Sequence, residues 1–140
     1  MEGRIVRFGV SIEDGLLKRF DERIDRRHYT NRSEAIRDLI RRDLVEEEWD
    51  ERGGEVIGAV TLVYDHHVRN LTERLNDFQH KHADEIVVSS HVHLDHHNCL
   101  EVIVVRGSGE RVRDLANHFR SVRGVKHATL STTTTGARLS

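Results

Sequence analysis

The chain begins with a stretch in which apolar and polar residues alternate. Apolar residues stand at positions 6, 8, 10 and 12, and Arg7, Gly9 and Ser11 stand between them. This period of two predicts a short strand with one apolar face. Apolar residues then recur at helical spacing, which predicts helices over residues 15–27 and 31–49. Asn31 followed three residues later by Glu34 has capping-box spacing at the start of the second helix.

A different pattern follows the glycine pair Gly53–Gly54, which interrupts the helical spacing and marks the predicted domain boundary. Strands are predicted over residues 56–64, 85–94, 99–107 and 125–133, and helices over 66–82 and 109–124. The order βαββαβ is typical of a ferredoxin-like domain with both helices on one face of the sheet. We therefore expect an α+β chain with an N-terminal domain over residues 1–52 and a C-terminal βαββαβ domain over 55–135.

Charge is divided unevenly between these two parts. Residues 1–42 hold 11 Lys and Arg against 8 Asp and Glu, whereas residues 43–140 hold 11 against 16, for a formal net charge of −2 in the whole chain. A weakly basic N-terminal part joined to an acidic C-terminal part hints at two tasks. Hydrophobic residues make up only 36% of the chain. Small modules of this composition often complete their cores by oligomerising.

The single cysteine excludes an intrachain disulfide. The charged first residues lack the apolar run of a signal peptide, and no apolar stretch is long enough to cross a bilayer. We therefore expect a cytoplasmic protein with no membrane association.

The predicted N-terminal strand has no partner within its own domain. Antiparallel pairing of two copies would give a two-stranded ribbon over four helices, with Arg7, Gly9 and Ser11 on its outer face. Such a ribbon fits the major groove of DNA, but it would serve equally well as a dimerisation module with a solvated polar face. The strand together with the stretch NRSEAIRDLIR at residues 31–41 resembles a ribbon-helix-helix DNA-binding domain. That resemblance favours DNA binding.

A histidine-rich stretch, HVHLDHHNC at residues 91–99, contains the only cysteine. Strand alternation places His91 and His93 on one face of the third predicted element of the C-terminal domain. The other face of that strand is the more apolar, so we expect it to contact the helices and the two histidines to lie on the open face. Cys99 joins them if it lies opposite His93, which requires an odd loop, and we expect the five residues 94–98 to form one. A two-residue turn at His96 and His97 would instead send the thiol to the helix side.

His80 lies about 180° from the apolar stripe of its predicted helix and therefore points away from its own core. It could reach the cluster of a second chain if two open sheet faces stack. His96 and His97 are interpreted as turn residues. Three imidazoles and a thiolate suit zinc in tetrahedral geometry, or copper or nickel in square-planar geometry, so the residues alone leave the metal open.

The ribbon-helix-helix head, the βαββαβ order and the spacing of His80, His91, His93 and Cys99 together resemble the nickel-responsive transcriptional regulator family (NikR) over roughly residues 5–130. The resemblance implies a homotetramer, a dimer of dimers, whose central regulatory domains are ACT-like. It implies one Ni²⁺ per subunit in a square-planar site. The ligands it implies are His91, His93 and Cys99 of one chain and His80 of another.

The same resemblance bears on two acidic residues and one glycine, and strand geometry suggests a role for a third acidic residue. Glu34 and Asp38 match family positions of a second, weaker cation site, although they could equally be solvated charges. Glu101, two residues past Cys99, shares its face and could orient a histidine ligand. Gly9 departs from the family, which often has a hydroxyl residue there, so base recognition would depend on Arg7 and Ser11.

These features predict a nickel-dependent repressor that binds double-stranded operator DNA. The alternative is a storage or delivery protein for zinc, copper or nickel that uses the same cluster. An enzyme is disfavoured, because four protein ligands leave no open coordination position on a planar metal. A small-molecule-binding ACT-like domain would leave the histidines unexplained.

Overall fold

The computed structural model describes residues 3–139. The chain divides into two compact units, of which the first ends at Leu44 and the second runs from Val45 to Ala137. None of the helices in the described part of the chain is long and apolar enough to cross a membrane.

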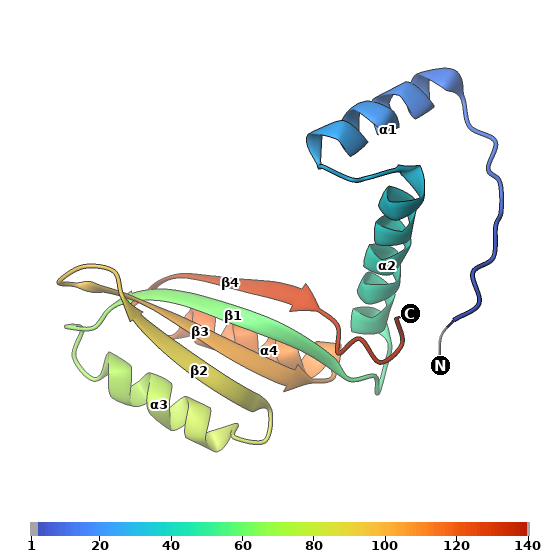
Figure 1. The fold of residues 1–140 in the computed structure, drawn as a ribbon. Coiled ribbons are helices and arrows are strands. Elements are labelled where there is room, and N and C mark those ends of the chain that lie inside the picture. The colour runs from blue at the N-terminus through green and yellow to red at the C-terminus, as the bar shows by residue number, and fades with distance from the viewer. Residues whose placement is uncertain (1–2, 140) are drawn as a thin grey trace. The chain divides into compact units, whose positions relative to one another are not determined.

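The first unit consists of α1 (Asp14–Arg26) and the greater part of α2 (Arg32–Asp50), drawn in blue and teal in Figure 1. The N–H of Glu34 donates to Oδ1 of Asn31 over 2.9 Å, which confirms the predicted cap of α2. Its described residues include only two buried hydrophobic side chains, Ile24 and Ala35. Such a small core cannot offset the conformational entropy of folding, so this unit needs a further partner.

The predicted strand over residues 5–12 is not formed in the single chain, where residues 3–13 belong to no helix or strand. Val6, Phe8 and Val10 are 67–74% exposed. The physical reason is that a strand is defined by hydrogen bonds to a neighbouring strand, and residues 3–44 contain no other strand. Pairing with a second copy therefore stays a prediction.

The second unit is a four-stranded antiparallel sheet with two helices on one face (Figure 1). Its elements follow the chain as β1 (Val56–Asp65), α3 (Leu71–Lys81), β2 (Ile86–His93), β3 (Asn98–Gly107), α4 (Gly109–Ser121) and β4 (Val125–Thr133). The strands lie in the order β2-β3-β1-β4. This arrangement confirms the predicted βαββαβ domain.

The core of this unit lies between the sheet and the two helices. Every second residue of β1 and β3 is buried there, together with Leu71 and Leu75 of α3 and Phe119 of α4. The last turn of α2 joins the core through Trp49, whose Nε1 donates to the carbonyl of Thr133 over 2.8 Å. The second unit therefore begins before the glycine pair at residues 53–54.

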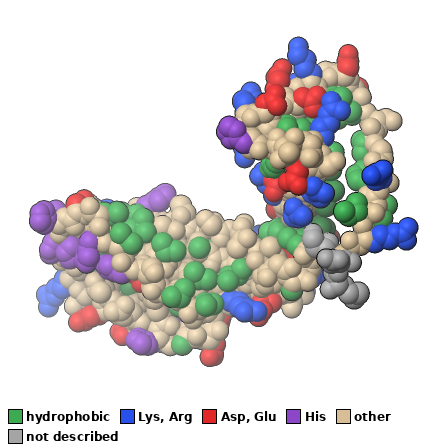
Figure 2. Space-filling model, viewed as in Figure 1, with side chains coloured by type: hydrophobic (Ala, Val, Ile, Leu, Met, Phe, Trp, Pro, Cys, Tyr) green, Lys and Arg blue, Asp and Glu red, His purple; other side chains and the backbone are tan. Residues whose placement is uncertain are grey.

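The opposite face of the sheet is apolar but uncovered. Val88, Val92 and Leu94 are 46–52% exposed on it. Figure 2 shows hydrophobic side chains spread over the surface of this unit. Exposed apolar side chains of this kind mark surfaces that proteins bury on association.

Candidate metal centre

The register between β2 and β3 decides where the histidines point. His93 pairs with Cys99 and His91 pairs with Glu101. Because paired residues share a face, the five-residue loop predicted from parity is confirmed. Cys99 and Glu101 are buried on the face that the helices cover. The expectation that His91 and His93 lie on the open face is therefore wrong, since they lie on the helix-covered face.

A bulge in β2 explains this error. Ile86 pairs with Val105, but Val88 pairs with Val104, so the register shifts between these two residues. Ile86 packs against the core, whereas Val88 is 52% exposed on the open face. One extra residue inverts the alternation of all residues that follow. The apolar residues after the bulge therefore lie on the open face, and His91 and His93 lie on the helix side, where both remain exposed.

The bulge brings the Cys99 thiol together with two imidazoles. Sγ of Cys99 lies 3.3 Å from Nδ1 of His66 and 3.5 Å from Nδ1 of His93. These three ligand atoms lie within 4.8 Å of one another. The ring of His91 is 5.0 Å from that of His93, centre to centre. The cluster occupies the end of the sheet where Figure 2 shows the histidines gathered.

Burial and nearby charge keep this thiol protonated. Burial raises the pKa of Cys99 above its ordinary value, and the carboxylates of Asp65, Asp95 and Glu101 raise it further. A metal ion binds the thiolate and would therefore displace this proton. Thiolate and imidazole nitrogen are donors that nickel, copper and zinc accept, so the chemistry of the donor set fits a borderline transition metal.

His91 is held by a hydrogen-bonded network beneath the cluster. Its Nδ1 lies 3.2 Å from the hydroxyl of Tyr64, which donates to Glu101 over 3.0 Å. Glu101 is 5% exposed and accepts two further hydrogen bonds, from Gln79 over 2.8 Å and from Ser89 over 2.6 Å. Burial and then the charge of Glu101 raise the pKa of Tyr64 far above its ordinary value. Glu101 thus contacts His91 through Tyr64 rather than directly.

The fourth predicted ligand, His80, lies apart from this cluster. It is an exposed residue in the last turn of α3, and it belongs to neither group of potential metal ligands that the described residues form. The expected stacking of two open sheet faces would not bring His80 to His91 and His93 of another chain, because these two histidines lie on the helix side of the sheet. Its exposure nevertheless leaves it available to a second chain.

His66 is the residue of this cluster that the sequence did not indicate. Antiparallel pairing places Tyr64 opposite Cys99 and Asp65 opposite Asn98, and His66 follows at once. Aligning the end of β1 with the start of β3 in an antiparallel register would have identified it. The pattern of a single strand contains no such information.

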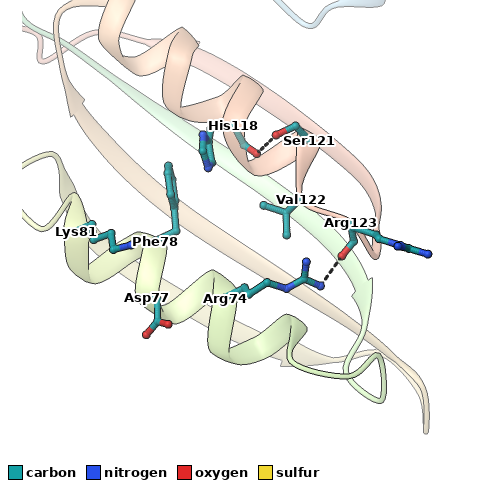
Figure 3. Close-up of a pocket in the computed structure, with 8 residues that line it drawn as sticks. All are labelled: Arg74, Asp77, Phe78, Lys81, His118, Ser121, Val122 and Arg123. Atoms are coloured by element: carbon teal, nitrogen blue, oxygen red, sulfur yellow. Dashed lines mark hydrogen bonds between the residues drawn. The ribbon is translucent and has the colours of Figure 1, made fainter.

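Five of the histidines outside the cluster lie in two groups. The rings of His82 and His118 both pack against Phe78, with centroids 4.3 and 4.1 Å away. Figure 3 shows His118 of α4 beside Phe78 of α3 in the lining of a pocket. His67 and His97 lie in the turns near the cluster, with their Nδ1 atoms 3.3 Å apart. His96 is exposed in the same turn as His97.

The predicted DNA contacts and the second cation site lie in the first unit. Arg7, Gly9 and Ser11 are exposed. Glu34 is hydrogen-bonded to Arg37. Asp38 accepts from Tyr29 and forms an ion pair with Arg42, and the bond from Tyr29 is the main reason that its pKa is lowered.

An N-terminal helical unit joined to a ferredoxin-like domain with a thiol–imidazole cluster defines a class of two-domain, metal-binding regulators. Residues 6–47 match the model of the ribbon-helix-helix proteins of the copG family. Residues 57–133 match that of the NikR C-terminal nickel-binding domain. The chain therefore belongs to the NikR family of nickel-responsive regulators.

Full-length relatives agree with this membership. The chain is 54% identical over 137 residues to a protein of Geotalea uraniireducens and 55% identical over 137 residues to one of Nitratidesulfovibrio vulgaris, covering 98% of this chain and 99% of each relative. A protein of Caldanaerobacter subterraneus is 52% identical, covering 99% of this chain and 90% of the relative. All three are named as nickel-responsive regulators.

A solved structure of low sequence identity shows the fold of part of the chain. An uncharacterized protein from Thermotoga maritima superimposes with a TM-score of 0.51 at 11% identity, covering 57% of this chain and 99% of that protein.

Proposed function

We propose that this protein is a nickel-responsive repressor, not an enzyme, that binds operator DNA when it holds Ni²⁺. The observation that carries the proposal is the buried Cys99 thiol, 3.5 Å from His93, whose ring neighbours that of His91, in a chain whose N-terminal part matches ribbon-helix-helix proteins. The metal cluster alone would equally suit a storage or delivery protein. A DNA-binding head gives such a protein no advantage.

The proposed ligands are His91, His93 and Cys99 of one subunit and His80 of another, with one Ni²⁺ per subunit. Three of them already lie at one end of the sheet, and the exposed His80 is free to approach from a second chain. The bound ion would supply a positive charge that stabilises the Cys99 thiolate and joins two subunits. Glu101 and Tyr64 would hold the His91 ring in a fixed orientation.

A homotetramer, built as a dimer of dimers, is the proposed assembly. The exposed apolar side chains of the open sheet face support association of the regulatory domains. The unpaired, exposed residues 5–12 support pairing of two heads into a ribbon. Arg7, Gly9 and Ser11 would then lie on the ribbon face that enters the major groove.

Nickel would control DNA binding because it stabilises the assembly that presents both ribbons. Glu34 and Asp38 remain candidates for a second, weaker cation site, in competition with their arginine partners. Binding energies at two coupled sites are reciprocal, so operator DNA should tighten nickel binding by the same factor by which nickel tightens DNA binding. A cytoplasmic location follows from action on DNA.

The test is selection of duplex DNA from a random pool by the nickel-loaded protein, followed by measurement of affinity for the selected sequence with and without Ni²⁺. We expect tight, sequence-specific binding only with nickel, and its loss in Cys99→Ala. His96→Ala is the matched control, since His96 lies in the same turn outside the proposed ligand set. Equal DNA affinity in both conditions would refute the regulator. Nickel binding with no selected sequence would support storage or delivery.

A further inference from the structure

The hydrogen bonds beneath the thiol cluster have a defined direction, which the buried carboxylate of Glu101 sets. Glu101 is 5% exposed and accepts at both of its oxygens. Its Oε1 accepts from Gln79 over 2.8 Å and from Ser89 over 2.6 Å, and its Oε2 accepts from the hydroxyl of Tyr64 over 3.0 Å. An ionised carboxylate has acceptors only, so the single hydroxyl proton of Tyr64 is directed at Glu101.

The oxygen of Tyr64 can then only accept from its second neighbour. Nδ1 of His91 lies 3.2 Å from this oxygen. Because the hydroxyl proton is directed at Glu101, a hydrogen bond between these two atoms requires a proton on Nδ1. A neutral imidazole carries a proton on only one ring nitrogen, so Nε2 of His91 keeps its lone pair. Burial and then the charge of Glu101 raise the pKa of Tyr64, which keeps the hydroxyl protonated.

We propose that Tyr64 is a positioning residue that selects the tautomer of His91 in which Nδ1 is protonated and Nε2 is free to bind the metal ion. The inference rests on the proposed nickel centre, in which His91 is a ligand, and adds which nitrogen binds and what decides it. Metal-ligating histidines commonly donate their other ring N–H to an acceptor, which fixes the tautomer. Here the acceptor is a phenol oxygen whose own proton is held by a buried carboxylate.

The direction of these bonds depends on the carboxylate, which gives the proposal a specific consequence. In Glu101→Gln, the two donors Gln79 and Ser89 would keep the amide oxygen in the place of Oε1. The amide nitrogen would then face Tyr64 and donate to its oxygen. The hydroxyl proton of Tyr64 would turn to Nδ1 of His91, and the imidazole proton would move to Nε2. We therefore expect this variant to hold the opposite tautomer.

The experiment measures the tautomer of His91 by long-range proton–nitrogen correlation spectroscopy on the metal-free, full-length protein labelled with isotopic histidine. It is done at about pH 8, where an ordinary histidine is largely neutral. The signals of His91 are those missing from His91→Ala. We expect a protonated Nδ1 in the unsubstituted protein, a mixture of both tautomers in Tyr64→Phe, and a protonated Nε2 in Glu101→Gln.

A matched control removes a hydrogen bond from the same network without changing its direction. Ser89→Ala deletes one donor to Oε1 and leaves the bond from Tyr64 to Oε2, so Nδ1 of His91 should stay protonated. The backbone amide spectrum shows whether each variant is folded. A protonated Nε2 in the unsubstituted protein, or a protonated Nδ1 that persists in Glu101→Gln, would overturn the proposal.

Nickel affinity, measured by chelator competition, separates this inference from the proposed function. Tyr64→Phe should weaken nickel binding about 10–100-fold. An unchanged affinity in this variant would overturn the role of Tyr64 in preparing His91 for the ion. If the unsubstituted protein binds no nickel while Nδ1 of His91 is protonated, the nickel centre is refuted and the tautomer assignment stands.

Discussion

Nickel binding should become tighter as the pH rises, because the ion displaces a proton from Cys99. An ordinary thiol has a pKa of about 8.5, and burial with nearby carboxylates raises that of Cys99. The thiol of Cys99 therefore carries its proton between pH 7 and 8. Releasing one proton per ion raises the apparent affinity tenfold per pH unit, or about 1.4 kcal/mol.

Competition binding against a nickel chelator at pH 7.0, 7.5 and 8.0 measures this slope directly. Calorimetry in buffers of different ionisation enthalpy should show about one proton released per ion. The same raised pKa means that the metal-free folded protein holds its thiol proton more tightly than the unfolded chain. Its stability should therefore fall as the pH rises above about 8.5, and Cys99→Ala should abolish that fall. A nickel affinity that does not change with pH would refute the buried, protonated thiol as a ligand.

Three further substitutions probe the network, the head and the core. Glu101→Gln replaces a carboxylate that accepts three hydrogen bonds. Nickel affinity, measured by chelator competition, should fall about 10–100-fold, while the circular dichroism spectrum stays the same. An unchanged affinity would contradict the role of Glu101 in orienting His91. Arg7→Ala should weaken binding to the selected operator DNA by about 1–3 kcal/mol, measured by gel shift, and should leave the nickel affinity measured without DNA unaltered. A normal gel shift would exclude base contact by Arg7. Phe119→Ala removes a fully buried ring, so the free energy of unfolding measured in urea should fall by about 3–5 kcal/mol. A decrease below about 1 kcal/mol would contradict the place of Phe119 in the core.

The sequence predicted the order of elements in the C-terminal domain and the pairing of His93 with Cys99. It could do so because helical and strand periods differ, and because loop parity alone sets which residues share a face. The N-terminal strand could be anticipated as a pattern, but its hydrogen-bond partner is not part of the single chain. Its formation therefore cannot be read from one chain's structure.

The face of β2 could not be predicted, because the bulge after Ile86 depends on how the strand pairs with β3. β2 is an edge strand that carries apolar residues on both faces, so its own pattern does not decide the alternation. The burial of Cys99 and Glu101 on the regular strand β3 does decide it. The side of His91 and His93 can be predicted only from the burial pattern of β3 and the pairing of β2 with it. That inference places both histidines on the face of the sheet that α3 covers.

That placement changes how the metal centre connects to the rest of the molecule. On the open face, His91 would have had no contact with α3. On the helix-covered face, it reaches Tyr64, then Glu101, and through Glu101 the side chain of Gln79 on α3. The next residue along α3 is His80, the proposed ligand for a neighbouring subunit. Three buried or partly buried hydrogen bonds therefore connect His91 to the residue that precedes His80.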